Sequence, residues 1–336
     1  MHEVLFYDKQ PDGSVICALC RHRCNIPSGA RGICRVRENR DGTLFSLVYG
    51  RVVAEHVDPV EKKPLFHFQP GTSSLSIATV GCNFRCLHCQ NHSIAQYDPG
   101  PNANIPGQLI PPEQIVATAL RNGCQSISYT YTEPTIFMEY ALDIARLAVE
   151  ARLKNIFVSN GYVTTEALDA IAPYLHAANI DLKGFSQDFY WRVAGGRLNE
   201  VLDCIRDYRR RGVWIEITTL VIPGENDSQI ELEGIAGFIA DDLGIDVPWH
   251  ISRFFPQYKM TGNPQTSATT LARAVEAGRR AGLRYIYEGN IVGGQENTSC
   301  PGCGLIVLRR SGFNVLENSL DEGACRHCGT GIAGVW

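Results

Sequence analysis

The sequence predicts an α/β protein with a parallel sheet, flanked by a cysteine-rich module at each end. Between residues 72 and 290, short β-branched apolar runs alternate with amphipathic stretches of helical length, which is the pattern of βαβ units. Six or so such units are enough for an incomplete (β/α) barrel, with an open doubly wound sheet as the alternative. Eleven of the thirteen cysteines fall into three clusters, and the outer two lie outside the alternating region. We therefore expect domains at 1–65, 66–293 and 294–336.

The expected elements follow from hydrophobic periodicity and from helix start and stop signals. Pro112 starts a helix, Thr164 precedes one, and Gly212 and Gly282 end two others. The predicted strands are 75–80, 126–131, 155–159, 178–182, 214–221, 248–253 and 284–287, and the predicted helices are 112–122, 135–150, 165–176, 198–211, 228–243 and 269–281.

Composition narrows the class of protein. The chain has 336 residues, of which 44% are hydrophobic and 20% charged, as is usual for a soluble globular protein. Its net charge of −4 provides no overall basic field for nucleic acid or an anionic membrane. No apolar run reaches transmembrane length and the first residues do not form a signal peptide, so the expected location is the cytoplasm, with no membrane partner.

Thirteen cysteines in a chain of this kind indicate bound metal rather than disulfides. Cys124 and Cys204 stand outside the three clusters and are expected to be buried core thiols. The N-terminal cluster consists of Cys17, Cys20, Cys24 and Cys34. Turn residues dominate its surroundings, so this segment cannot build a large core and is expected to need a stabilising cross-link. Structural zinc is the leading interpretation. An auxiliary iron–sulfur cluster or thiols near the substrate are the alternatives.

The central cluster is a single loop with Cys82, Cys86 and Cys89 at C-x-x-x-C-x-x-C spacing, directly after a predicted strand. Cuboidal iron–sulfur clusters are normally held by four thiolates. Three thiolates leave one iron with an open position, as a catalytic metal requires. A zinc knuckle or buried thiols is the alternative.

Polar residues gather where the predicted strands end, and parallel α/β folds bind ligands at that edge. Glu133 follows the second strand, Ser159 and Asn160 end the third, and Asp181 and Lys183 flank the end of the fourth. At i and i+2, Asp181 and Lys183 face the same side, which favours a functional site over a structural ion pair.

The last cluster pairs Cys300 and Cys303 with Cys325 and Cys328, as two Cys-x-x-Cys knuckles across a hairpin-like stretch. This arrangement is typical of a zinc ribbon with Cys₄ ligation, and bound Zn²⁺ would fold a module otherwise too small to persist. A second iron–sulfur cluster is the alternative.

The loop Gly-Cys-Asn-x-x-Cys-x-x-Cys-x-Asn (81–91) resembles the signature of radical S-adenosylmethionine (SAM) enzymes, particularly those resembling the pyruvate formate-lyase activating enzyme. Together, the N-terminal module, Tyr-Thr-Glu-Pro (131–134) and the C-terminal knuckles most resemble the AmmeMemoRadiSam-system radical SAM family. The resemblance implies a partial (β/α)6-type TIM-like barrel carrying a [4Fe-4S] cluster and SAM. It implies a one-electron donor such as flavodoxin or ferredoxin, and it also implies AMMECR1-like and Memo-like proteins as possible partners.

The resemblance also implies roles for individual residues. Glu133 would receive the SAM amino group, Ser159 and Asn160 would lie on the ribose side, and Asp181 and Lys183 would lie beside SAM and the substrate. The family often has a Phe-His element at the end of the sixth strand, where this chain has Phe-Phe (254–255). His250 is therefore a candidate cofactor contact, with a core or cap histidine as the equal alternative.

The implied reaction is reductive cleavage of SAM to methionine and a 5′-deoxyadenosyl radical that abstracts hydrogen from an unidentified substrate. That substrate is a glycyl-radical protein, an RNA or a small molecule. A rival hypothesis is a non-catalytic iron–sulfur or zinc protein that binds RNA or a protein partner.

Overall fold

The computed structural model describes residues 1–98, 100, 104–291 and 293–336. Within them, eight strands form the central sheet, in the order β16-β15-β14-β13-β12-β11-β9-β8. Neighbouring strands are parallel throughout, except that β8 is antiparallel to β9. The sheet is open between β8 and β16, as expected for a partial barrel. The strands are β8 (Ala54–Pro59), β9 (Ser73–Ala78), β11 (Ser126–Tyr129), β12 (Lys154–Ser159), β13 (Ala177–Asp181), β14 (Trp214–Val221), β15 (Trp249–Arg253) and β16 (Ile286–Gly289).

Helices connect the parallel strands. The main ones are α2 (Pro112–Arg121), α3 (Met138–Glu150), α4 (Thr165–Ile171), α6 (Leu198–Arg210), α7 (Gln229–Phe238) and α8 (Ala268–Arg280). Thr164, Ser228 and Ser267 cap α4, α7 and α8 by accepting a hydrogen bond from the backbone N–H three residues on. Shorter segments are α1 (His92–Ala95), α5 (Gln187–Phe189), η1 (Val60–Lys62), η2 (Pro134–Phe137), η3 (Ala172–Tyr174), η4 (Tyr190–Ala194) and η5 (Ile239–Leu243).

Each predicted strand and helix of the barrel overlaps an observed element, with shifts of a few residues at the ends. The expected helix 135–150 starts with the 3₁₀ turn η2 and becomes α-helical only at Met138. Strand β8 was not predicted. It pairs with β9 along its whole length, from Ala54 to Pro59, so the central sheet already begins at residue 54.

The N-terminal strands form two small sheets. One contains β1 (His2–Glu3), β6 (Thr43–Ser46) and β5 (Arg37–Arg40), and the other contains β2 (Tyr7–Lys9), β3 (Val15–Cys17) and β4 (Asn25–Ile26). The strand β7 (Arg51–Val52), which precedes β8, pairs with β10 (Gln108–Leu109), which lies between β9 and β11 in sequence. Val15, Leu19 and Val36 are almost fully buried and belong to the same hydrophobic core as the barrel.

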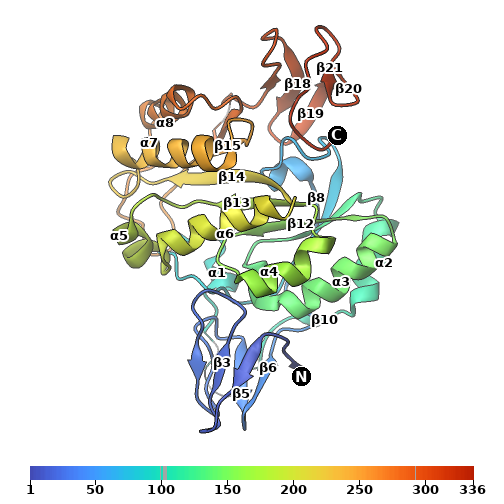
Figure 1. Cartoon of the computed structure of the whole chain (residues 1–336), viewed down its shortest axis with the longest axis vertical. Coiled ribbons are helices and arrows are strands. Elements are labelled where there is room, and N and C mark those ends of the chain that lie inside the picture. Colours follow the sequence, from blue (N-terminus) through green and yellow to red (C-terminus); the bar gives the residue numbers. More distant parts are fainter. Residues whose placement is uncertain (99, 101–103, 292) are drawn as a thin grey trace.

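The C-terminal strands β17 (Thr298–Ser299), β18 (Ile306–Ser311), β19 (Asn314–Asn318), β20 (Leu320–Asp321) and β21 (Ala324–Cys325) form two further small sheets. Arg310 attaches them to the barrel, because its buried guanidinium donates to Phe66 O at 2.6 Å and to Thr298 Oγ1 at 2.9 Å. Figure 1 shows the N-terminal and C-terminal strands at opposite ends of the long axis, with the barrel between them. No helix of the described residues is both long and apolar enough to cross a membrane.

Candidate active site

A cavity of about 480 Å³ opens where the parallel strands end. Its wall contains residues from the cysteine loop and from β12, β13, β14, β15 and β16, together with the segment that follows β8 and Phe313 of the β18–β19 turn. The candidate residues Cys82, Cys86, Cys89, Glu133, Ser159, Asn160, Asp181, Lys183 and His250 all line this one cavity. Residues separated by up to 168 positions in the sequence are thus brought together, because parallel strands place their carboxyl ends at the same edge of the sheet.

The cysteine loop is held close to the barrel by its backbone. Gly81 has a φ of +100°, and a Cβ there would lie 2.7 Å from Val36 Cγ1, so only glycine fits. Further along, Arg85 N donates to Ala194 O at 2.9 Å and Leu87 N to Val193 O at 2.9 Å. Burial raises the pKa of Cys86 to about 11, although Lys183 opposes the shift. These thiols are therefore protonated unless a bound cation lowers the pKa.

Glu133 is buried, with 1% of its surface exposed, and its carboxylate accepts four hydrogen bonds. Oε1 accepts from Thr135 N, Thr135 Oγ1 and Ser159 Oγ, and Oε2 accepts from Asn160 N at 2.8 Å. The side chain caps η2 and ties the loop after β11 to the end of β12. Burial raises the pKa of Glu133. Among the described residues no cation forms an ion pair with it.

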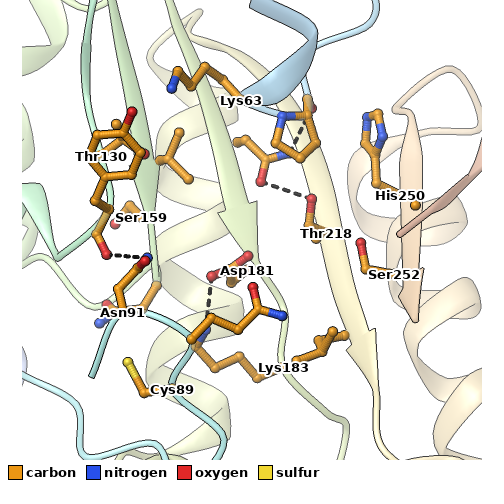
Figure 2. A pocket seen from close by; sticks show the side chains of 18 of the residues that line it. Lys63, Cys89, Asn91, Thr130, Ser159, Asp181, Lys183, Thr218, His250 and Ser252 are labelled. Carbon is orange, nitrogen blue, oxygen red and sulfur yellow. Dashed lines mark hydrogen bonds and ion pairs between the residues drawn. The ribbon is translucent and has the colours of Figure 1, made fainter. Parts of the chain in front are cut away.

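Asp181 and Lys183 form an ion pair, with Lys183 Nζ 2.8 Å from Asp181 Oδ2. Figure 2 shows the pair on the side of the cavity where Cys89 lies. Burial alone would lower the pKa of Lys183, but Asp181 and Cys86 outweigh it and raise the pKa. Lys183 is therefore a fixed cation beside the cysteine loop rather than a proton acceptor.

His250 lines the opposite part of the cavity, beside Ser252 (Figure 2). Its Nε2 lies 2.7 Å from Oε2 of Glu216, a fully buried carboxylate that also accepts from the backbone N–H groups of Phe66 and His67. His250 and Glu216 lie on adjacent strands, β15 and β14.

Sequence reasoning missed Glu216 and also Lys63, which lines the cavity and whose Nζ is 2.6 Å from Asp58 Oδ2. Burial lowers the pKa of Lys63 to about 8. The signal for Glu216 was available, since a charged residue stands in the middle of the apolar run Trp214–Val221.

The C-terminal cysteines form a compact group. The sulfur atoms of Cys300, Cys303, Cys325 and Cys328 all lie within 4.8 Å of one another, so they could hold a metal ion. Cys300 Sγ is 3.5 Å from Cys328 Sγ, and Cys303 Sγ is 3.9 Å from Cys325 Sγ. In a tetrahedral zinc site with Zn–S bonds of about 2.3 Å, the sulfurs stand about 3.8 Å apart.

The N-terminal cysteines Cys17, Cys20, Cys24 and Cys34 surround a second, small cavity, which they line together with Arg37 and Asn83. No three of these four sulfurs lie within 4.8 Å of one another. The same is true of the sulfurs of the three loop cysteines. In the described part of the chain, only the four C-terminal cysteines have their sulfurs this close together.

The sequence matches the family description Radical SAM superfamily over residues 76–232. The uncharacterized protein MJ0808 of Methanocaldococcus jannaschii is 42% identical over 335 residues, which cover 99% of each chain. MJ1632 of the same organism, named provisionally as a glycyl-radical enzyme activating enzyme, is 24% identical over 54% of this chain and 68% of its own. The fold is similar to that of Streptococcus suis SuiB bound to S-adenosylmethionine, with a TM-score of 0.51 and 14% identity over 69% of this chain and 53% of SuiB.

Proposed function

This chain belongs to the radical SAM superfamily and is an enzyme, and from that premise we propose that its 480 Å³ cavity holds a [4Fe-4S] cluster on Cys82, Cys86 and Cys89 with SAM beside it. The observation that carries the proposal is that three loop cysteines line the same cavity as Glu133, a buried carboxylate that forms no ion pair with any described residue. The cluster and SAM together supply reductive cleavage of SAM and a 5′-deoxyadenosyl radical that abstracts hydrogen from the substrate.

The side chains around the loop fit the polar groups of SAM. Glu133 is buried and carries a charge that nothing in the described protein neutralises, so the ammonium group of SAM would be its counter-ion in a charge-assisted hydrogen bond. Asn160 Oδ1 is buried and has no hydrogen-bond partner among the described residues, so it is available to accept from a ribose hydroxyl. Such orphaned acceptors are costly unless a ligand satisfies them.

Asp181 and Lys183 would orient SAM and the substrate on the side of the cysteine loop. Lys183 carries a positive charge whatever the pH near neutrality, because its pKa is raised. It would therefore balance the negative charge of the thiolate-bound cluster. His250 is held by Glu216 on the far side of the cavity and would contact the substrate or the end of SAM that reaches that wall.

The substrate is best proposed as a segment of a partner protein, an RNA or a small molecule, in the manner of an activating enzyme or of a modification enzyme. Flavodoxin or ferredoxin would supply the electron, and AMMECR1-like and Memo-like proteins are proposed partners. We also propose that 294–336 is a zinc ribbon. Its sulfur spacings of 3.5 and 3.9 Å are close to those of tetrahedral Cys₄ ligation.

The test is anaerobic reconstitution with iron and sulfide, followed by addition of dithionite and SAM. We expect 5′-deoxyadenosine and methionine from the wild-type chain and neither from Cys82→Ala. Cys124→Ala is the matched control, because Cys124 is buried in the barrel core and does not line the cavity. A protein with a complete cluster that yields no 5′-deoxyadenosine would overturn the proposal. Deuterated candidate substrates would then show which one transfers label to 5′-deoxyadenosine.

A further inference from the structure

The N-terminal cysteines form a site of their own. Cys17 lies at the end of β3, Cys20 and Cys24 lie in the turn that joins β3 to β4, and Cys34 precedes β5. All four line one cavity of about 10 Å³, whose other walls include Leu19, Ile26 and Ile136. Four inward-facing thiols in an apolar enclosure are a ligand set that a metal centre would deprotonate.

The spacing of these sulfurs distinguishes between the two kinds of metal centre considered for four cysteines, a zinc ion and a cuboidal iron–sulfur cluster. A tetrahedral zinc site holds sulfurs about 3.8 Å apart, and the C-terminal cysteines have that spacing. In the N-terminal group no three sulfurs come within 4.8 Å of one another. In a cuboidal cluster each thiolate binds a different iron atom at a corner of the cube, so the sulfurs stand farther apart, as they do in the loop of Cys82, Cys86 and Cys89.

The enclosed space agrees with the wider spacing. Four sulfurs about 2.3 Å from a central zinc ion leave no room for a water-sized sphere, which needs roughly 10–15 Å³. The N-terminal cavity provides about 10 Å³. The space that the four N-terminal sulfurs enclose is therefore larger than the space inside a closed zinc site.

Two buried residues of this cavity carry donor atoms that lack a partner in the described protein. Arg37 is 1% exposed, and while its Nη2 pairs with Oε2 of Glu139, its Nε and Nη1 have no hydrogen-bond partner among the described residues. Asn83 is also 1% exposed, and its Nδ2 has no partner there either. Both residues line the cavity. Buried donors without acceptors are costly, and the sulfides and thiolates of a negatively charged cluster would accept from them.

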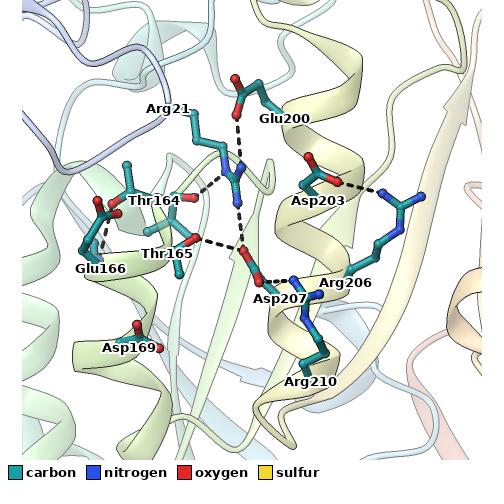
Figure 3. Close-up of polar contacts among 12 residues, drawn as sticks. Arg21, Thr164, Thr165, Glu166, Asp169, Glu200, Asp203, Arg206, Asp207 and Arg210 are labelled. Carbon is teal, nitrogen blue, oxygen red and sulfur yellow. Dashed lines mark hydrogen bonds and ion pairs between the residues drawn. The ribbon is translucent and has the colours of Figure 1, made fainter.

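The cavity lies next to the loop that carries the other cysteines. Asn83 belongs to that loop, and its backbone O is 2.9 Å from His22 Nε2. The neighbouring Arg21 holds the segment in place, since its guanidinium donates to Glu200 and Asp207 of α6 at 3.0 Å each (Figure 3). The N-terminal segment is thus held against the barrel through Arg21 and His22.

We propose that Cys17, Cys20, Cys24 and Cys34 ligate a second iron–sulfur cluster, of the cuboidal Cys₄ type, with Arg37 and Asn83 donating hydrogen bonds to its sulfur atoms. All four ligands come from the N-terminal segment, so the proposal holds whether or not the loop cluster cleaves SAM.

The experiment uses the full chain with Cys82, Cys86 and Cys89 all changed to Ala, which removes the loop cluster. After anaerobic reconstitution we expect about four iron atoms and four sulfides per chain, with about one zinc from the C-terminal site. Adding Cys34→Ser should remove most of that iron, whereas adding Cys204→Ala, at a buried cysteine that does not line the cavity, should retain it. An iron-free triple variant, with a second zinc or with no N-terminal metal, would overturn the proposal.

Should the triple variant fail to fold, the wild-type chain gives the same answer. Two cuboidal clusters contain about eight iron atoms per chain and one contains about four. About eight that fall to about four in Cys34→Ser support the proposal, and an iron content that Cys34→Ser leaves unchanged overturns it.

A second measurement tests the donors. Arg37→Lys keeps a cation for Glu139 but removes Nε and Nη1. Because hydrogen bonds to the sulfurs raise a cluster's reduction potential, the potential of the N-terminal cluster should become more negative in this variant. An unchanged potential would show that Arg37 does not contact a cluster.

Discussion

Glu133→Gln is the sharpest test of how SAM is held. The carboxylate is buried, accepts four hydrogen bonds from Thr135, Ser159 and Asn160, and has no cation in the described protein. If the SAM ammonium is its counter-ion, the amide loses a charge-assisted hydrogen bond of about 1.5–3 kcal/mol, and the Kd for SAM rises about 10- to 150-fold. The assay is equilibrium dialysis of labelled SAM with the anaerobically reconstituted protein.

The substitution also has a structural cost, which a second variant measures. A glutamine amide cannot accept at both oxygen positions, so one of the four donors loses its partner and the free energy of unfolding falls by about 1–3 kcal/mol. Thr135→Val removes one of the same hydrogen bonds but keeps the charge. It should lower stability with little change in SAM affinity. If Glu133→Gln lowers stability but binds SAM as the wild type does, Glu133 is only a cap and the proposed role is wrong.

The pH dependence of SAM binding follows from the same carboxylate. Burial raises the pKa of Glu133 above its ordinary value of 4.5, and only the ionised form pairs with an ammonium. SAM affinity should therefore be highest above the pKa of the free protein and should fall as the pH drops through it. Glu133→Gln should abolish this dependence.

Three further predictions concern the modules and the loop. Cys300→Ser should lose the C-terminal zinc and lower the Tm while leaving the iron–sulfur absorption, as metal analysis and spectroscopy would show; retained zinc would contradict the ribbon. Arg310→Leu leaves Glu61 buried without its cation and should cost about 3–5 kcal/mol in urea unfolding. Burial raises the pKa of Glu61, so this loss should be smallest near pH 4.5 and grow as the pH rises through the folded-state pKa; a constant loss would refute the pairing. Gly81→Ala should destabilise the chain and reduce its iron content, because a Cβ there meets a side chain at 2.7 Å, whereas Gly212→Ala, at a φ of +77° with nothing within 4 Å, should cost only about 1 kcal/mol of backbone strain and keep the iron.

The barrel could be predicted from the sequence because its signals are local. Each strand is a short apolar run, and several helices have their own start or stop residue, such as Thr164 before α4 and Gly282 after α8. The positions of Glu133, Asp181 and Lys183 followed from one further rule, that parallel strands present their carboxyl ends at the same edge. Strand β8 could not be found in this way, because Ala54–Pro59 contains glutamate, histidine and aspartate and has no apolar alternation of its own.

The contact between Glu216 and His250 could not be predicted from the sequence, for a different reason. The two residues are 34 positions apart, and only the register of β14 against β15 brings them together. A glutamate within an apolar strand does indicate a buried partner. The sequence offers several histidines as that partner, however, and strand register is not a local property.

The N-terminal cysteines show how the structure changes an argument from composition. A segment rich in turns was expected to need a structural zinc ion because it could not build a core of its own. In the structure, Val15, Leu19 and Val36 are buried in the same hydrophobic core as Ile77 of β9, so burial against the barrel already stabilises this segment. The reason for structural zinc is therefore removed there.

The C-terminal module keeps that reason, because its buried residues Val307, Leu308 and Cys325 belong to a separate, smaller cluster, to which, among the described residues, the barrel side contributes only Phe66, Tyr285 and Tyr287. Small cores of this kind are the ones that depend on a metal. The proposed zinc at the C-terminal cysteines and the proposed iron–sulfur cluster at the N-terminal ones agree with this difference, because only the C-terminal module has a small core that a structural metal would stabilise.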